Sequence, residues 1–214
     1  MRRREIIAAA GGVALSAVAG CLGAAGLDEH EAAPAGVDPS VRESTGYERT
    51  NVEELVVRET VGAAGVSEEI VVTNYLTEHE KSVSFGPLGS VRAAAFVVLT
   101  SPQISIAGRG FNPIAEMSTG ELVDLLGAEF EGINEVEHVS DGEVTILEQE
   151  TVESIFEGEA EVEGMTVDVN IHITESVQTT NDHLTTVGVY PTQIRGSEEE
   201  NIRSLMGAVV EEPN

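Results

Sequence analysis

Basic and aromatic residues are scarce in this chain of 214 residues. It has 11 lysines and arginines against 38 aspartates and glutamates, no tryptophan and one cysteine. A single cysteine excludes a disulfide within the chain, so a folded domain has to depend on its hydrophobic core. Three arginines lie at the N-terminus, and the remaining basic residues form no cluster. This distribution argues against nucleic acid and anionic membrane surfaces as partners.

The acidic excess gives a formal net charge of −27 at pH 7. So many like charges repel one another in dilute salt, whereas a Debye length of roughly 3 Å in molar salt screens them. The composition resembles that of proteins from salt-loving archaea, and we interpret it as an adaptation to a hypersaline medium. An acidic surface that binds cations or a basic partner is the alternative, but the excess is spread along the whole chain.

An export signal is predicted over residues 1–20. Arg3 and Arg4 are followed, after one residue, by Ile6 and Ile7. This order resembles the core of a twin-arginine signal. The uncharged stretch that follows is dominated by alanine and glycine, and such a weakly apolar core suits twin-arginine export better than general secretion.

The single cysteine, Cys21, ends a stretch that resembles a lipobox, with Val18, Ala19 and Gly20 before it. In lipoproteins of this type the signal is cleaved in front of the cysteine, and the thiol is alkylated with a diacylglycerol-type lipid. Two acyl chains are needed for firm anchoring. The alternatives are an unmodified buried thiol and a retained membrane helix over residues 6–27. Either membrane attachment leaves the bulk of the chain outside the cell.

The rest of the chain is predicted to hold one domain. Residues 21–46 are rich in Ala, Gly, Pro and acid without sustained periodicity, which predicts a tether. Residues 47–212 are predicted to form a single extracytoplasmic α+β domain, an antiparallel sheet of six or seven strands covered by two amphipathic helices. Apolar periodicity and capping-box spacing place the helices at 119–131 and 197–210. The order of elements loosely resembles the sandwich of PsbP-type photosystem subunits.

Apolar runs and turn residues place the strands of this sheet. A hairpin is expected around the loop 62–65, a central strand over 92–102, one strand over 143–152 and a last strand over 183–191.

A further hairpin is predicted over residues 155–175, with a two-residue turn at 163–164. This register pairs Phe156 with Ile171 and places apolar residues on one face of the hairpin. Acidic residues share the other face with His172. The alternation indicates a sheet that is wet on one side.

Several segments of the sequence carry a more specific resemblance. They are the lipobox, STGYERTNVEELVV, VVTNYLTEHEK, GPLGSVRAAAFVVLTSPQ, FNPIAEMSTGELVDLL and the late GVYP. Together they resemble a family of haloarchaeal predicted twin-arginine-exported lipoproteins of unknown function. The resemblance covers most of the chain and implies twin-arginine export, lipid attachment at Cys21 and a halophilic source. It brings no catalytic or ligand-binding residues.

No motif in the sequence specifies a reaction. The HExxH, GxxxxGK and GxSxG patterns are absent, and the five histidines lack ligand spacing. We therefore predict no catalytic residue, no metal site and no cofactor. The glutamates from Glu157 to Glu163 alternate along one strand about 6.6 Å apart and point in parallel, so they do not converge on one ion. We interpret them as a solvated acidic face.

The loop over residues 107–117 is the best candidate for a ligand site. It holds Arg109 and Asn112 shortly before a predicted helix N-terminus, where an anion would be stabilised. An ordinary strand-to-helix connection, with Phe111 and Ile114 filling the core, explains the same residues.

The anchor, the single domain and the missing catalytic motif predict a non-enzymatic protein, lipid-anchored on the external face of the cell membrane. It would contact membrane lipid through Cys21 and bind an envelope protein or a small ligand. The alternative is an envelope hydrolase with an unrecognised site, which predicts a deep pocket where a histidine and carboxylates converge. A solute-binding lipoprotein fits less well, because its usual two-lobed architecture needs a longer chain.

Overall fold

The computed structural model describes residues 29–63, 66–84, 90–106, 109–110, 117–123, 133–162 and 165–211. No helix within these ranges has the length and apolar character needed to span a membrane.

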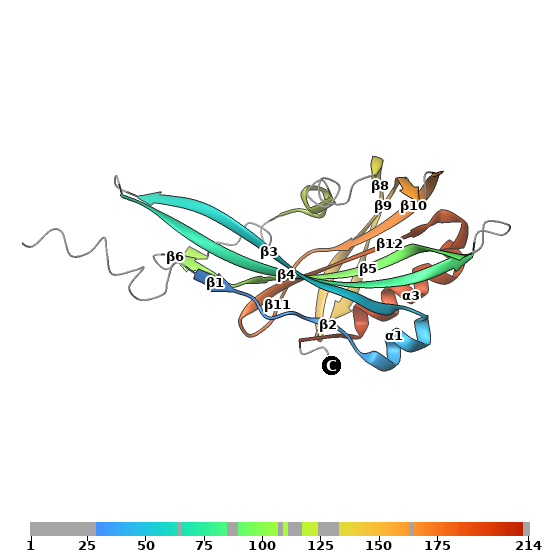
Figure 1. Cartoon of the computed structure of the whole chain (residues 1–214), viewed down its shortest axis with the longest axis horizontal. Coiled ribbons are helices and arrows are strands. Elements are labelled where there is room, and N and C mark those ends of the chain that lie inside the picture. Colours follow the sequence, from blue (N-terminus) through green and yellow to red (C-terminus); the bar gives the residue numbers. More distant parts are fainter. Residues whose placement is uncertain are drawn as a thin grey trace, which may run out of the picture.

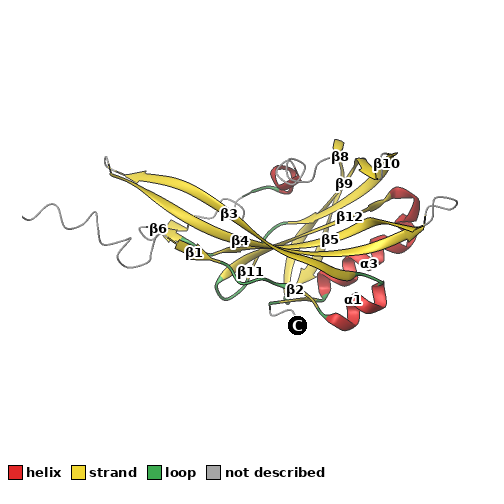
Figure 2. Ribbon diagram, viewed as in Figure 1, coloured by secondary structure: helices red, strands yellow, loops and turns green. Residues whose placement is uncertain are grey.

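Most of the described chain is β-structure, and nine strands form one mixed sheet (Figures 1 and 2). They are β1 (Glu29–Glu31), β3 (Glu48–Ala63), β4 (Val66–Ser84), β5 (Ser90–Pro102), β8 (Asn134–Ile146), β9 (Gln149–Val162), β10 (Met165–Thr174), β11 (Val177–Gln178) and β12 (Asp182–Pro191). Their order is β1-β4-β5-β12-β10-β9-β8, with β3 beside β4 and β11 beside β12. The predicted antiparallel sheet of six or seven strands is therefore corrected, because β1 adds a parallel pairing to β4.

The hairpin predicted over residues 155–175 is confirmed in its register. Strands β9 and β10 pair Phe156 with Ile171 and Val162 with Met165. Alternating apolar residues specify this register, because a slip by one residue would turn the whole apolar set to the other face. The hairpin expected around residues 62–65 also forms, from β3 and β4, which pair from Glu48↔Glu80 to Ala63↔Val66.

The apolar run over residues 92–102 is central, as predicted, because β5 pairs with β4 on one side and β12 on the other. The single strand predicted over residues 143–152 is wrong. The chain turns at Leu147 and Glu148, whose φ angles are 48° and 62°. Two consecutive left-handed residues build a tight hairpin turn that normally uses Asn and Gly. The sequence therefore carried no turn signal at the point where β8 ends and β9 begins.

Two apolar layers lie on opposite faces of the sheet. One holds Phe96 and Tyr190 together with Ile202, Leu205 and Met206 of helix α3 (Arg195–Gly207), which follows the short 3-10 helix η3 (Thr192–Ile194). The other holds neighbouring strand residues, such as Val97 and Val187, with Leu122 and Val123. Successive strand residues point to opposite faces, so adjacent positions feed different layers.

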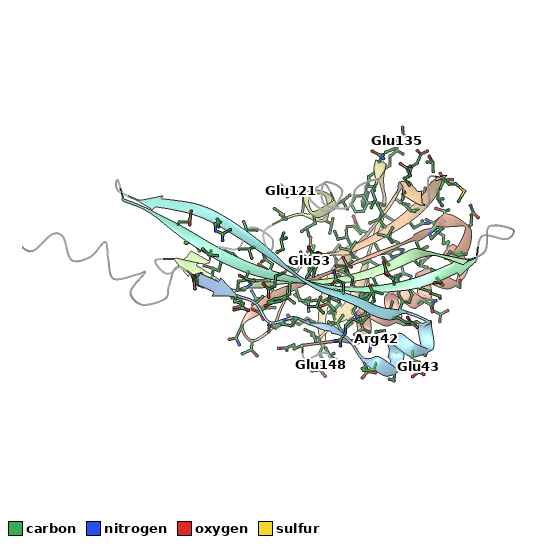
Figure 3. The ribbon with its side chains drawn as sticks, in the orientation of Figure 1. Arg42, Glu43, Glu53, Glu121, Glu135 and Glu148 are labelled. Atoms are coloured by element: carbon green, nitrogen blue, oxygen red, sulfur yellow. The ribbon has the colours of Figure 1, made fainter. Side chains whose placement is uncertain are left out.

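The two predicted helical segments therefore contribute to different apolar layers. Residues 119–123 are helical, and Ser118 and Glu121 cap this segment reciprocally as predicted, with Ser118 N donating to Glu121 Oε2 over 2.9 Å. Figure 3 shows Glu121 on the other side of the central strands from Arg42, which belongs to helix α1 (Pro39–Thr45). The predicted residues 124–131 lie outside the described chain.

Helix α3 confirms the predicted C-terminal helix but differs at both ends. It begins at Arg195 and ends at Gly207. Ser197 lies inside the first turn and donates to the carbonyl of Ile194, so the predicted capping box at Ser197 does not form. At the other end, strand β13 (Val209–Val210) pairs with strand β2 (Gly36–Val37).

The second half of the predicted tether is packed on the domain. Asp38 caps helix α1 by accepting from Ser40 N over 2.8 Å, with a proline at the first helical position. Ala35, Val37 and Tyr47 are buried in the layer under α3. The domain therefore begins with β1, well before residue 47. The remaining two described strands, β6 (Ser105–Ile106) and β7 (Arg109–Gly110), form a small sheet of their own.

Helix α3 lies very close to strand β12 at Gly188. A Cβ atom added at Gly188 would lie 2.7 Å from both Cδ1 and Cγ2 of Ile202. Ile202 is fully buried. Its Cγ2 is bonded to Cβ, so this methyl group cannot move far without a shift of the helix backbone. The absence of a side chain at residue 188 therefore sets the distance between helix and sheet.

The Gly188→Ala variant is expected to be destabilised by about 1–3 kcal/mol, because the new methyl group displaces Ile202 from a filled core. Denaturant unfolding in concentrated salt would measure the loss. Gly196→Ala is the matched control on α3, since nothing lies within 4 Å of its added Cβ. Alanine there should be neutral or stabilising by up to about 1 kcal/mol. Equal unfolding midpoints for the two variants would contradict the close approach.

Candidate functional site

Polar side chains from three strands meet beneath helix α3. Glu153 lies on β9, His172 on β10 and Tyr190 on β12. Register explains their meeting, because His172 pairs with Gly188 and Thr174 pairs with Glu153, which places all three side chains on the face that α3 covers.

These side chains form a continuous hydrogen-bonded chain. Nδ1 of His172 lies 2.7 Å from Oε1 of Glu153, and Nε2 of His172 lies 2.8 Å from the Tyr190 hydroxyl. A carboxylate only accepts, so Nδ1 donates its proton to Glu153 and Nε2 accepts from the Tyr190 O–H. Arg203 on α3 completes the network by donating Nε–H to Oε2 of Glu153 over 2.9 Å.

The network is sealed from solvent on the side of the sheet. Glu153, His172 and Tyr190 are each exposed by 1% or less, whereas the Arg203 side chain is 44% exposed. Burial on its own raises the pKa of the Glu153 carboxyl. Hydrogen bonds from His172 and Arg203, together with the charge of Arg203, outweigh that effect and hold the pKa below its ordinary value. Burial, and then the nearby charge of Glu199, raise the pKa of Tyr190 to about 12.

The order hydroxyl, imidazole, carboxylate is that of a nucleophile, its base and an orienting group. Here the hydroxyl is fully buried, and its raised pKa opposes ionisation. The arrangement instead locks one His172 tautomer and satisfies every polar atom in the chain of hydrogen bonds. Its physical role is to attach α3 to the sheet.

A second buried carboxylate makes the reciprocal attachment. Glu198 of α3 is 2% exposed and accepts from Lys81 Nζ over 2.6 Å, from the Tyr47 hydroxyl over 3.1 Å and from Asn201 Nδ2 over 3.0 Å. Burial first, and then the Glu198 charge, raise the pKa of Tyr47. Lys81, the single lysine of the chain, therefore serves the interior of the domain.

The exposed side of α3 borders an open hollow of about 470 Å³, lined by Arg195, Gly196, Glu199, Glu200, Arg203 and Ser204. Both arginines already have acidic partners. Arg195 donates to Glu157 over 2.8 Å and also to Asn170, and Arg203 lies 3.0 Å from Glu199. Two guanidinium groups and two carboxylates line the hollow, so it offers no excess positive charge to an anion.

The predicted site residues lie largely outside the described chain. This holds for Arg3, Arg4, Ile6, Ile7, Val18, Ala19, Gly20, Cys21 and Asn112. Arg109 lies in β7, where its backbone pairs with Ile106, and its side chain is not among those described. The ligand loop therefore stays a prediction.

The five histidines lie on five different strands, and within the described residues no three metal-ligating side chains converge. The predicted wet face of β10 is wrong at its C-terminal end, because α3 and η3 cover His172 and Asn170, which are fully buried. Glu153 was missed by the sequence reasoning. Its one available signal was its position four residues before Glu157, which places it on the same strand face as the acidic row.

Fold and site together describe a mostly β domain whose polar network is buried beneath a C-terminal helix. The chain belongs to the family described as Domain of unknown function (DUF6517), which matches residues 34–210. This confirms the expected membership of an uncharacterised family. The PsbP-type likeness and the haloarchaeal and lipoprotein character stay predictions.

Other comparisons add little. No curated protein matches the chain. Among solved structures it is similar to a protein of unknown function, PA94, from Pseudomonas aeruginosa, with 12% identity over 73% of this chain and 99% of that chain. The TM-score is 0.32, too low for an inference about fold or function.

Glu153→Gln is expected to lower the free energy of unfolding by about 3 kcal/mol, because Arg203 and His172 lose a buried anionic partner. Glu157→Gln is the matched control on the same strand face. Its carboxylate pairs with Arg195 but is 49% exposed, so the loss should be at most about 1 kcal/mol. Denaturant unfolding at neutral pH measures both, and equal losses would contradict the assigned role of Glu153.

His79 on β4 gives the domain a separate dependence on pH. It is fully buried, Nδ1 lies 3.1 Å from the carbonyl of Phe96, and Nε2 has no hydrogen-bond partner within the described structure. Burial lowers the pKa of His79 to about 4, despite the hydrogen bond to Phe96, and the charges of Arg42 and Arg49 act in the same direction as burial. The unfolded chain therefore binds the proton more tightly than the native protein between pH 6.5 and 4.

The native protein should lose stability as pH falls through that window. His79→Gln removes this titration, so the loss between pH 7 and pH 5 should be smaller in the variant by about 2 kcal/mol. Unfolding curves at several pH values in concentrated salt would show the difference. Parallel stability profiles for the two proteins would contradict a buried, neutral His79.

Proposed function

We propose that this protein is a non-enzymatic binding or accessory domain, anchored by lipid at Cys21 to the external face of the cell membrane of a halophile. The observation that carries the proposal is the position of Cys21, which ends a lipobox-like stretch eight residues before the first strand of the domain. The acidic composition supports a hypersaline exterior, where screening removes much of the repulsion between carboxylates.

The packed residues 29–46 supply the structural support for an accessory role close to the bilayer. Eight residue steps separate Cys21 from Glu29, and a fully extended chain covers about 3.5 Å per residue. The lipid would therefore hold the domain within about 28 Å of the membrane. Because β1 enters the sheet beside β4, the end of the sheet that carries β1 is the end tied to the membrane. Such a module acts on membrane-bound partners.

An envelope hydrolase is the second candidate, and the Tyr190–His172–Glu153 chain is the observation that favours it. A substrate would have to displace α3 to reach that chain, since all three side chains are buried. The deep, accessible pocket that a hydrolase needs is not formed at this cluster, and the binding module remains the better proposal.

Intact-mass analysis of the membrane fraction from a halophilic host tests the anchor. The wild-type protein should have the mass of the chain from Cys21 plus a diacylglycerol-type lipid. Cys21→Ser should lose the lipid mass and leave the membrane fraction or keep its signal. Ser16→Ala, a conservative change earlier in the apolar stretch, should behave like the wild type. An uncleaved, unmodified wild-type mass would sink the lipoprotein proposal and favour a retained helix over residues 6–27.

A further inference from the structure

Strands β3 and β4 extend beyond the rest of the sheet as a two-stranded arm. Strand β5 pairs with β4 from Tyr75 to Ser84, so residues 55–63 and 66–74 form a ribbon past its end (Figure 1). We call these two segments the arm. Strand β1 adds three pairings to the arm, at Val71–Thr73. An isolated two-stranded ribbon is marginal in water, and three or more strands are normally needed for stability.

The outer edge of the arm is not interrupted by bulges, which are one of the features that protect an edge strand. Among the described strands β3 is hydrogen-bonded to β4 alone, and its register runs unbroken from Asn51 to Ala63. Strand β8, at the opposite edge of the sheet, is interrupted by two register shifts and by a left-handed residue, Glu135. Bulges and breaks of this kind prevent edge-to-edge pairing. The β3 edge has a single irregularity, before Asn51, and is open to pairing along the arm.

Some side chains on β3 are exposed apolar groups or charged groups without an ionic partner among the described residues. Val52 and Val56 are 43% and 40% exposed and lie on the same face of the strand. Arg58 on that face forms no ion pair with any side chain that the structure describes. Glu54 lies between the two valines. Its carboxylate accepts a hydrogen bond from the Tyr75 hydroxyl over 3.3 Å and has no basic partner among described residues. In a chain of net charge −27, an unpaired arginine is a conspicuous feature.

We propose that a second copy of this chain pairs with the arm, β3 against β3 in antiparallel register about a two-fold axis at Val56. Residues directly opposite in an antiparallel pair share a face. The register then places Val56 against its own copy and Arg58 against Glu54 on both sides of the axis. Leu55 lies against Val57 on the other face. Residues 55–61 of each β3 then lie against residues 51–57 of the other copy's β3.

Neighbouring registers fit less well. An axis at Glu54 places that carboxylate against its own copy. An axis at Leu55 sets Val52 against Arg58, and an axis at Val57 sets Val56 against Arg58. Only the axis at Val56 joins apolar pairs to two Arg–Glu pairs. Its one unfavourable pairing is Glu53 with Glu59, which occurs on each side of the axis next to the Arg58–Glu54 pair, where concentrated salt screens the repulsion.

The size of this contact predicts weak association in solution. Pairing along one edge falls in the class of small interfaces, below about 1,200 Å² in total. A tethered chain meets its copy at a far higher effective concentration than a free one. Dimers should therefore form on the membrane and, in solution, only at high protein concentration. Pairing does not depend on the lipid anchor, so it can be tested whether or not Cys21 is modified.

Cysteine cross-linking of the full-length protein in concentrated salt tests the register. In Val56→Cys, the two Cα atoms would lie about 4.5–5.5 Å apart across the axis, inside the range of Cα separations that a disulfide spans. Val52→Cys is the matched control, with the same residue type, face and exposure. Its two copies would lie eight residue steps apart, about 27 Å. The wild-type protein shows any linkage through Cys21.

Under mild oxidation, the Val56→Cys protein should form a disulfide-linked dimer at least tenfold faster than Val52→Cys and the wild type. In the Val56→Cys background, Glu54→Arg and Arg58→Glu should each slow the linkage severalfold, and the two combined should restore it. Equal rates for the two cysteine variants, or no linkage at position 56, would overturn the proposal. Failure of the double charge reversal to restore the rate would overturn this register.

Discussion

The attachment of helix α3 to the sheet depends on two buried carboxylates that act in opposite directions. Glu153 lies on the sheet and accepts a hydrogen bond from Arg203 of the helix. Glu198 lies on the helix and accepts a hydrogen bond from Lys81 of the sheet. A buried ion pair adds little net stability when both partners are present, but the loss of one partner is costly. The two pairs therefore mainly fix the position of α3 along the strands, because any other position of the helix would leave a buried charge without its partner.

Packing around these pairs reinforces the same position. Tyr190 and Tyr47 each direct a hydroxyl into one of the two polar clusters while their rings fill the apolar layer. Gly188 allows Ile202 to approach β12 without a side chain between them. The helix is thus held both by an apolar layer and by charged contacts. Basic residues are rare in this chain, so the use of Lys81 inside the domain limits those available to its surface.

Much of the strand pattern was predictable, because alternation of apolar residues is a strong local signal. The register of Phe156 with Ile171 and the central position of β5 both follow from it. Local signals failed where backbone conformation overrode residue type, as at Leu147 and Glu148, which adopt a turn without Asn or Gly. Local signals also failed where a segment distant in the sequence buries a residue. His172 reads as solvated on its own strand, and it is buried because residues from 192 onward fold over it.

The structure of the N-terminal part of the domain could not be predicted from the sequence for a related reason. Residues 29–46 are too short and too irregular to show a period, and tertiary contacts order them: β2 pairs with β13 from the far end of the chain. The candidate site could not be predicted for the same physical reason, since Glu153, His172, Tyr190 and Arg203 come from four elements. The sequence shows each residue but not the packing that brings them together.

The parallel pairing of β1 with β4 has a mechanical consequence. Tension on the N-terminal end of the domain runs along β1, whose three residues pair with Val71–Thr73. A pull along the strand axis loads these pairings in shear, so they bear the force together and do not open one after another like a zipper. The first strand therefore acts as a mechanical clamp. It would transmit force from the N-terminal side of the domain into β4, the longest strand of the sheet, before the core under α3 is strained.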